Sequence, residues 1–281
     1  MTLWLNGKLV AEEEAHIDPA DRGFLLGDGL FETMATRHGK VIFGDLHLDR
    51  LQRGADVLGL EIPFDKPALM EAMSSLLVVN DLAETARAAV RLTLTRGAAP
   101  RGLVPIPGGT PTLVIACFAL STPKSSVSAI IASGRRNEFS PTANMKALPY
   151  LDQIMARREA AEAGADDAIM LNTQGKVACA TAANLFLWDS NTLITPSLRE
   201  GCLAGTTRHM ILEVAKGTGI DALEESITPS TLANVESAFL TNSLTGIQPL
   251  SEIASRKLSL HPKQQALSDA LEQAEIRSIS E

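Results

Sequence analysis

Lys146 and Tyr150 lie close together in the segment Asn144–Tyr150, and Tyr150 is the only tyrosine of the chain. A run with helical character, Leu151–Ala163, follows them. An amine beside an apolar segment loses its proton more readily than a solvated amine, and a phenol can donate a hydrogen bond to a nearby oxygen. A pyridoxal 5'-phosphate (PLP) site needs both groups, the amine as nucleophile and the hydroxyl for the phenolate oxygen of the ring. Taken alone, the segment is weak evidence, because most lysines are solvated surface residues.

Further segments on both sides of Lys146 bear on whether this lysine belongs to a PLP site. They are Ile17–Thr33, His47–Leu51, Ala182–Phe186, Leu203–Arg208 and Phe239–Ser243. In this order, the segments resemble those of the class IV (fold type IV) PLP-dependent enzymes. That family includes branched-chain aminotransferases, D-amino acid aminotransferases and 4-amino-4-deoxychorismate lyases.

The resemblance extends from about Leu3 to Leu250, and it has consequences for the fold. It implies a two-domain fold of mixed α+β or α/β type, similar to D-amino acid aminotransferase, with PLP as the cofactor. We expect a smaller N-terminal α/β domain at residues 1–120, a linker at 121–128 and a larger C-terminal PLP-binding domain at 129–281. Ser, Thr, Pro and Lys dominate the linker segment, and such residues pack poorly.

Catalytic and substrate-binding residues follow from the same resemblance. It implies that Lys146 forms the internal Schiff base with PLP and then transfers the Cα proton as a general base and acid. Phe31 and Arg101 are the expected substrate-binding residues. A guanidinium can bind a carboxylate through two parallel hydrogen bonds, which suits Arg101. Leu103 stands where the D-amino acid aminotransferases have a histidine, and Arg101 is otherwise a solvated loop residue.

The cofactor-binding residues form a larger predicted set. Gly205-Thr206-Thr207 precedes a helical run, and free N–H groups at a helix start attract the PLP phosphate. An ordinary N-cap is the alternative for these residues. The full predicted set is Arg50, Tyr150, Cys179, Thr181, Asn184, Leu203, Thr206, Thr207, Thr241, Asn242 and Ser243.

Cys179 marks a departure from the family pattern. The relatives place a glutamate there, whose carboxylate keeps the pyridine nitrogen protonated. A thiol is mostly neutral at pH 7 and forms weak hydrogen bonds. We therefore expect a weaker electron sink with cofactor binding intact.

Composition excludes several other classes of protein. At 281 residues and 45% hydrophobic, the chain can bury a large core. Its net charge of −8 is scattered without a basic stripe, which argues against nucleic acid as a partner. The apolar stretches are strand-length and no signal-like segment opens the chain, so we expect no membrane association and a cytoplasmic location. The three cysteines and five histidines are dispersed and predict neither disulfides nor a metal site.

Hydrophobic periodicity predicts helices and strands that do not alternate regularly. Asn6-Gly7 between two apolar-polar runs predicts a hairpin over Leu3–Val10. Helices are expected at residues 46–58, 67–79, 148–163, 207–216 and 263–274. Strands are expected at residues 88–95, 112–119, 127–133, 167–171, 184–188, 192–194 and 237–241.

The first interpretation of function is a PLP-dependent aminotransferase that moves an amino group between an amino acid, of branched-chain or D-type, and a 2-oxo acid. The alternative is a 4-amino-4-deoxychorismate lyase that releases pyruvate and 4-aminobenzoate. A second alternative is a PLP-binding protein whose catalysis lapsed with the missing glutamate. The resemblance also implies a homodimer whose active sites take loops, the Arg101 loop among them, from the partner subunit.

Overall fold

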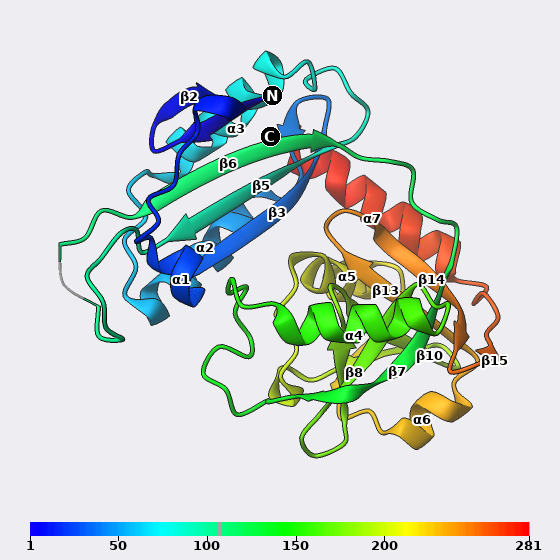
Figure 1. The fold of residues 1–281 in the computed structure, drawn as a ribbon. Helices are drawn as coiled ribbons and strands as arrows, with labels where there is room; N and C mark the ends of the chain where they lie inside the picture. Colours follow the sequence, from blue (N-terminus) through cyan, green and yellow to red (C-terminus); the bar gives the residue numbers. More distant parts are fainter. Residues whose placement is uncertain (106–107, 281) are drawn as a thin grey trace. The chain divides into compact units, whose positions relative to one another are not determined.

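The computed structural model describes residues 1–105 and 108–280, and its chain divides into two compact units. Unit 1 comprises Met1–Ser121, Lys146–Pro149 and Glu275–Glu281. Unit 2 comprises Thr122–Met145 and Tyr150–Ala274. Each unit is built on a sheet of its own with helices packed against it (Figure 1). The expected mixture of helices and strands is thereby confirmed.

Unit 1 contains a six-stranded sheet in the order β2-β1-β6-β5-β3-β4, and all its neighbouring strands are antiparallel. Asn6 and Gly7 both have positive φ, as the turn of the expected β1–β2 hairpin requires. The elements of unit 1 are β1 (Thr2–Leu5), β2 (Lys8–Ala11), η1 (Glu12–Glu14), α1 (Arg22–Leu26), β3 (Gly29–Arg37), β4 (Lys40–Val41), α2 (Gly44–Leu58), α3 (Lys66–Val79), β5 (Ala88–Thr95) and β6 (Thr112–Ala119).

Helix α2 packs one face against β3. Leu48, Leu51 and Ala55 lie on this buried face at helical spacing. His47 and Arg50 are buried on the same face, although polar side chains are usually exposed. The helix therefore carries two basic side chains into the interior of unit 1.

Unit 2 contains a nine-stranded sheet, ordered β12-β11-β10-β13-β14-β7-β8-β9 with β15 paired to β14. Parallel pairs join β7 to both β8 and β14, and β11 to β12. The elements are β7 (Val127–Arg136), α4 (Leu151–Glu162), β8 (Asp167–Asn172), β9 (Val177–Ala180), β10 (Asn184–Asp189), β11 (Thr192–Pro196), η2 (Leu198–Glu200), α5 (Thr206–Gly217), β12 (Asp221–Glu225), α6 (Pro229–Asn234), β13 (Ser237–Asn242), β14 (Gly246–Ile253), β15 (Arg256–Lys257) and α7 (Gln264–Ser278).

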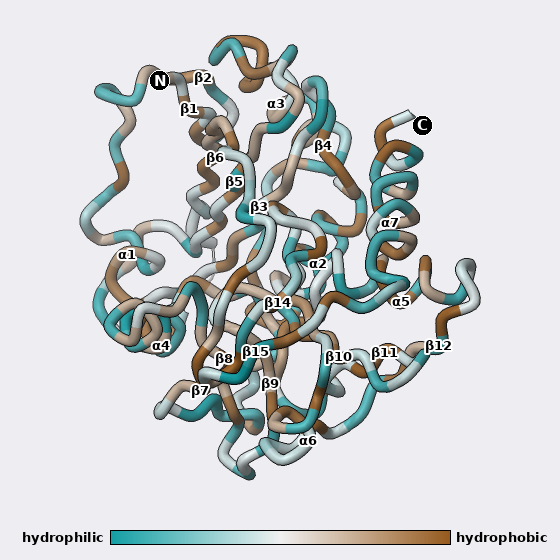
Figure 2. The backbone as a smooth tube through the Cα atoms, turned by 90° about the vertical axis from the view of Figure 1, so that its right-hand side faces the viewer, coloured by the Kyte–Doolittle hydropathy of each residue, from teal (hydrophilic) through white to brown (hydrophobic). Residues whose placement is uncertain are grey.

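The core of unit 2 follows its central strands. Every residue of β8 and β9 is buried, and the tube around them is largely brown in Figure 2. Small residues of α4, Ala156 and Ala160, pack against Ala132 of β7 and Ala168 of β8. A strand buried on both faces reads as a continuous apolar run, which is why β8 could be recognised in the sequence.

Most expected elements are confirmed within a few residues, and the expected strands at 88–95 and 112–119 coincide with β5 and β6. The expected helix start at Leu148 is wrong, because α4 begins at Leu151. Leu148 precedes Pro149, whose ring disfavours helical backbone at the preceding residue. Strands β3, β4, β9, β12, β14 and β15, helices α1 and α6 and the short helices η1 and η2 were not expected as elements. Among the described residues, every helix is too short or too polar to cross a bilayer.

Candidate active site

Lys146 lies beside the edge of β3, within unit 1. The Phe31 N–H donates to the Lys146 carbonyl at 3.0 Å, and the Leu148 N–H donates to the Gly29 carbonyl at 3.0 Å. Leu30 and Ala147 form an antiparallel bridge between these two bonds. These hydrogen bonds thus fix the backbone of Lys146 against the edge of β3 in the unit 1 sheet.

The environment of the Lys146 amine makes it a usable nucleophile. Its Nζ lies 4.3 Å from the centroid of the Phe31 ring, and Arg91 Cζ lies 4.0 Å from the same centroid. Burial of the amine, together with the charges of Arg50 and Arg91, lowers the pKa of Lys146 to about 8, although Glu32 opposes the shift. A substantial fraction of the amine is therefore neutral just above physiological pH.

Glu32 of β3 and two residues of α2 form a buried charged network in unit 1. Arg50 Nε donates to Glu32 Oε1 at 2.8 Å, and Arg50 Nη2 donates to Glu32 Oε2 at 2.6 Å. His47 Nδ1 lies 2.7 Å from Glu32 Oε2. Glu32 and His47 are each 1% exposed. This two-point ion pair fixes the guanidinium of Arg50.

The pKa shifts within this network define its charges. Burial alone would raise the pKa of Glu32, but Arg50 and His47 outweigh burial and lower it to about 2. Burial lowers the pKa of His47 despite the hydrogen bond with Glu32. His47 is therefore neutral at pH 7, and its Nδ1 carries the proton donated to Glu32. The network holds one anion and one cation, so it adds little net charge near Lys146.

The sequence-based prediction missed Glu32, His47 and Arg91 as site residues. Glu32 lies on an alternating strand and His47 on an amphipathic helix, and neither pattern by itself shows that they meet. The available signal was the helical spacing, which placed His47 and Arg50 on the apolar face of α2. Arg91 gave no comparable signal.

The predicted substrate-binding residues also lie in unit 1. Phe31 is 6% exposed and points away from the face that carries Glu32, because successive side chains of a strand alternate. Arg101 is exposed on the loop between β5 and β6, followed by Leu103 at 81% exposed. Phe31 thus contacts the Lys146 amine, whereas Arg101 is available to a molecule from outside unit 1.

The start of α5 is the candidate phosphate-binding site of unit 2. Thr206 and Thr207 are buried in its first turn, and the N-cap residue Gly205 supplies no side-chain cap. A Cβ on Gly205 would lie 2.1 Å from Asn184 Oδ1, so only glycine fits. Thr206 Oγ1 lies 3.3 Å from Ser243 Oγ. The first N–H groups of the helix and these hydroxyls form a compact set of donors.

Asn184 and Thr241 extend this set of donors. They are paired across β10 and β13, so their side chains share one face of the sheet. Asn184 Nδ2 donates to the Leu203 carbonyl at 2.9 Å, beside the α5 start. Thr241 is 1% exposed, and its hydroxyl has no hydrogen-bond partner among the residues that the structure describes. A buried hydroxyl without a partner is costly, and an anion held at this place would satisfy it.

The side chain of Asn242 forms hydrogen bonds with the backbone of its own loop. Its Oδ1 accepts hydrogen bonds from the N–H of Leu244 at 2.9 Å and the N–H of Thr245 at 3.0 Å. This turn fixes the backbone that carries Ser243. Unit 2 therefore brings together Asn184, Leu203, Thr206, Thr207, Thr241, Asn242 and Ser243.

Cys179 is buried in a separate cluster with Ala178 and Cys202. Burial raises the pKa of the Cys179 thiol, with Arg136 opposing and Asp167 reinforcing the shift. Burial likewise raises the pKa of Cys202 to about 12. Both thiols are neutral at pH 7, so Cys179 supplies no negative charge at the position where the resemblance leads us to expect a carboxylate.

Tyr150 and Thr181 complete the predicted set. Tyr150 is the residue immediately before α4 and is half-buried. Thr181 Oγ1 donates to Asp167 Oδ1 at 2.6 Å, and Arg157 pairs with the other carboxylate oxygen at 2.6 Å. Thr181 is thus held by an acidic partner.

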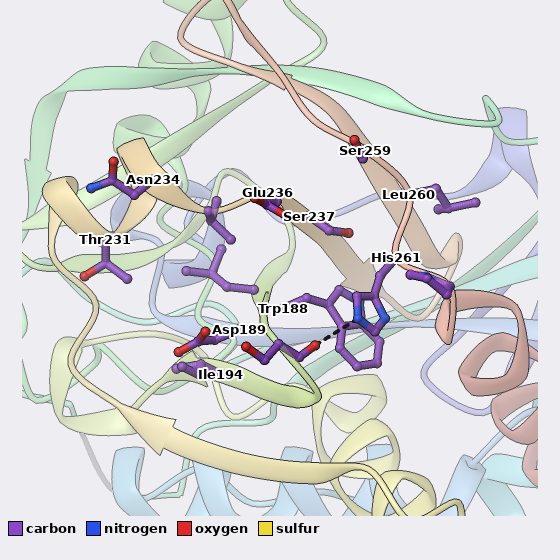
Figure 3. Close-up of a pocket in the computed structure, with 14 residues that line it drawn as sticks. Trp188, Asp189, Ile194, Thr231, Asn234, Glu236, Ser237, Ser259, Leu260 and His261 are labelled. Atoms are coloured by element: carbon purple, nitrogen blue, oxygen red, sulfur yellow. Dashed lines mark hydrogen bonds between the residues drawn. The ribbon is translucent and has the colours of Figure 1, made fainter.

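A cavity of about 630 Å³ lies elsewhere in unit 2. Trp188 and His261 stack on its wall with ring centroids 3.8 Å apart, and His261 Nε2 lies 2.9 Å from the Ser190 carbonyl (Figure 3). None of the predicted site residues lines this cavity. It therefore adds nothing to the candidate active site.

The residues present fit PLP. In the described part of the chain, no three His, Cys, Asp or Glu side chains gather where they could hold an ion. The orphaned hydroxyl of Thr241 beside an uncapped helix start suits a phosphate, and the lowered pKa of Lys146 suits an aldehyde.

Comparison with known proteins gives a consistent result. The family model for class IV amino-transferases matches residues 29–253. A Methanocaldococcus jannaschii protein, provisionally named as a branched-chain-amino-acid aminotransferase, is 34% identical over 92% of this chain and 90% of that protein. An aminodeoxychorismate lyase of Bacillus subtilis is 31% identical over 89% of this chain and 86% of the lyase.

The solved structures agree with the sequence relatives. The branched-chain aminotransferase of Thermoproteus uzoniensis, crystallised with norvaline, is 30% identical and has a TM-score of 0.90. The match covers 99% of this chain and 95% of the archaeal enzyme.

Proposed function

The chain belongs to the class IV aminotransferases, and we propose that it transfers an amino group from an amino acid with an apolar side chain to a 2-oxo acid. Its fold is the fold type IV of these enzymes, and its cofactor is PLP. The observation that carries the proposal is the Lys146 amine, whose pKa falls to about 8 against the ring of Phe31. Relatives named as branched-chain aminotransferases support an apolar substrate.

Each residue has a proposed task. PLP, when bound, supplies an aldehyde that bonds covalently to an amine and a ring that accepts electrons from Cα. Lys146 provides that amine and, once displaced by the substrate amine, accepts and returns a proton at Nζ. Thr206, Thr207 and the Thr241–Ser243 segment bind the phosphate. We keep Arg50 as a predicted phosphate ligand and Tyr150 as the donor to the phenolate oxygen.

The substrate carboxylate is assigned to Arg101. Its guanidinium is exposed on a loop and can bind a carboxylate with two hydrogen bonds. Phe31 covers the Lys146 amine and limits access of water.

The lyase is the second candidate, favoured by the similarity to the B. subtilis aminodeoxychorismate lyase. The third candidate, a PLP-binding protein with lapsed catalysis, predicts no turnover of either substrate.

One experiment separates the three candidates. The yellow PLP-loaded protein is incubated with L- and D-amino acids, and loss of the yellow colour together with 2-oxo acid formation is measured. Oxo acid formation from one of them supports the aminotransferase. Pyruvate released from aminodeoxychorismate without any amino acceptor would replace it by the lyase. Absence of both reactions would leave a binding protein.

We propose further that the protein is a cytoplasmic homodimer. Helix α1 exposes Phe24, Leu25 and Leu26, and Leu103 and Val104 are exposed on the neighbouring loop, at 49–83% each. A face of this kind is suited to a second copy of the chain. The three buried, unpaired cysteines fit a reducing compartment. Light scattering of wild type and Phe24→Asp tests the dimer, since an unchanged mass for the variant would exclude this face.

A further inference from the structure

The loop that carries Arg101 joins β5 to β6 and is tied at its base to the segment before α1. The Arg22 N–H donates to the Gly97 carbonyl at 2.9 Å, and the Ala99 N–H donates to the Ala20 carbonyl at 3.3 Å. Long loops without secondary structure are usually variable in conformation. Here the first residues of the loop are held in fixed register.

A buried carboxylate joins both ends of this loop. Asp21 is 0% exposed, and its Oδ2 accepts hydrogen bonds from Thr95 Oγ1 at 2.8 Å and from Thr112 Oγ1 at 2.7 Å. Gly97 reinforces the closure, because a Cβ there would lie 1.9 Å from the Thr110 carbonyl oxygen. The two ends of the loop are therefore drawn to one point.

The guanidinium of Arg22 extends this support to the tip of the loop. Its Nη1 donates to the Gly102 carbonyl at 2.6 Å and its Nη2 donates to the Leu103 carbonyl at 2.9 Å. Its Nε donates to Asp28 Oδ2 at 2.7 Å, and Arg22 is only 5% exposed. The two carbonyls that follow Arg101 are thus bound by one buried cation.

Arg96 offers a matched comparison within the same cluster. Its Nε donates to Asp28 Oδ2 at 2.8 Å, and its remaining nitrogens donate to the carbonyls of Leu58 and Gly59 at 2.8 and 3.0 Å. Burial would raise the pKa of Asp28, but the hydrogen bonds and charges of Arg96 and Arg22 lower it. Both arginines therefore bind an ionised Asp28, yet only Arg22 reaches the tip of the loop.

We propose that Arg22 is a positioning residue that fixes the backbone around Arg101 for binding the substrate carboxylate. Two-point recognition of a carboxylate requires the guanidinium to be placed within about 0.5 Å. Arg22 itself has no contact with substrate in this proposal and acts through the carbonyls of Gly102 and Leu103. The inference rests on the proposed function, in which Arg101 binds that carboxylate.

The test uses PLP-loaded protein and an amino acid that the proposed incubation experiment identifies as an amino donor. Arg22→Lys keeps a cation beside Asp28, but its single nitrogen cannot reproduce the three bonds that Nε, Nη1 and Nη2 of the guanidinium form with Asp28, Gly102 and Leu103. We expect it to raise the KM of the amino acid about tenfold with a smaller change in kcat. Arg96→Lys, the matched control, should change KM less than about twofold. Reaction with a primary amine of the same side chain but no carboxylate should fall no more in Arg22→Lys than in Arg96→Lys.

A double-mutant cycle shows whether Arg22 acts through Arg101. Arg101→Ala should raise KM about a hundredfold, and adding Arg22→Lys should then change KM by less than about twofold. Trypsin cleavage of the Arg101–Gly102 bond provides a readout independent of activity. Arg22→Lys should accelerate this cleavage, whereas Arg96→Lys should not.

The outcomes separate the two hypotheses. An unchanged KM in Arg101→Ala would overturn the carboxylate assignment of the proposed function. A raised KM in Arg101→Ala with an unchanged KM in Arg22→Lys would overturn the positioning inference alone, as would full additivity of the two changes. If Arg22→Lys does not fold, Asp28→Asn takes its place, because it keeps both arginines and removes the charge that orients them. An unaltered KM and cleavage rate in Asp28→Asn would then overturn the inference.

Discussion

The polar groups around Lys146 in unit 1 carry full charges, whereas those proposed for the phosphate in unit 2 are neutral. Glu32 and Arg50 are buried as an ion pair, and their charges act on the lysine amine. Thr206, Thr241 and Ser243 offer only hydroxyls, together with the first N–H groups of α5. Burial is the largest cause of the lowered pKa of Lys146, and the charges of Arg50 and Glu32 act on that pKa in opposite directions. The hydroxyls and N–H groups of unit 2 are neutral donors, which can hold an anion without a counterion of their own.

Removing the Lys146 amine of unit 1 should have the largest effect on activity. Lys146→Met should lower transamination about 10⁴-fold or more, because the group that transfers the proton is lost. Borohydride reduction of wild type followed by peptide mapping should place the pyridoxyl group on Lys146. Labelling of another lysine would refute the assignment.

The same substitution should stabilise the protein without PLP at pH 7. The folded-state pKa of Lys146 is about 8, below the unfolded value of 10.5, so the protonated amine is penalised in the folded state. Allowing for its partial exposure, Lys146→Met should raise the free energy of unfolding by about 2 kcal/mol at pH 7. Wild type should regain this difference as the pH rises from about 8 to 10.5. Denaturant unfolding of both apo proteins at several pH values measures it.

Glu32→Gln should have the next largest effect, because it leaves Arg50 buried without its anion. The expected loss is about 3–5 kcal/mol of unfolding free energy at pH 7. The folded-state pKa of Glu32 is about 2, below its ordinary 4.5, so the stabilisation is present above 4.5 and disappears as the pH falls towards 2. The difference from wild type should shrink over that range.

Glu71→Gln serves as the control for this change, since Glu71 is exposed on α3. A surface change of this kind should alter stability by less than about 0.5 kcal/mol. Equal losses in Glu32→Gln and Glu71→Gln would show that the buried network contributes nothing specific.

In unit 2, Thr241→Val should act in opposite directions on folding and on cofactor binding. It removes a buried hydroxyl without a protein partner, so the apo protein should gain about 1–2 kcal/mol. Affinity for PLP should fall by about 1.5–3 kcal/mol, because a donor to the phosphate is lost. PLP titration and denaturant unfolding give the two values.

Thr195 provides the matched control for Thr241. It is equally buried at 1% exposed, but its hydroxyl donates to the Leu185 carbonyl at 2.8 Å. Thr195→Val should lose stability and leave PLP affinity unchanged. If Thr241→Val behaves in the same way, Thr241 is not a phosphate ligand.

The smallest expected effect concerns Cys179. Returning a carboxylate there with Cys179→Glu should speed single-turnover Cα deprotonation about tenfold, which corresponds to about 1.4 kcal/mol of carbanion stabilisation. Cys179→Ala should leave the rate near that of wild type, because the thiol is neutral. A folded, PLP-loaded Cys179→Glu with an unchanged rate would mean that the reaction does not depend on a carboxylate at this position.

Local patterns were sufficient to predict many elements of the fold. β5 and β8 have the alternating or continuous apolar pattern of strands, and α2 has the spacing of an amphipathic helix. The start of α4 was predictable in principle, because Pro149 disfavours helical backbone at Leu148. Strand β14 escaped because most of its residues are only half-buried and Pro249 interrupts its pattern.

The two halves of the candidate site differed in how far the sequence could predict them. The Thr206 and Thr241 regions were predictable because each is a contiguous polar segment next to a helix start or a strand end. The network of Glu32 with His47 and Arg50 was not, because it depends on tertiary packing of α2 against β3. The pKa of Lys146 depends on that packing as well, so the sequence could name the lysine but not its protonation.

The four residues Lys146–Pro149 and the end of α7 have a consequence for biosynthesis. The β3 edge at Gly29–Phe31 stays unpaired until Lys146 has been synthesised, and the contacts of Arg37 with Glu275 and of Lys40 with Ile279 form only after Glu275 and Ile279 have been added. A nascent chain released early therefore exposes an open strand edge of the kind that recruits other strands. Since Lys146 is fixed on that same edge, closure of the edge and placement of the reactive amine are one folding event.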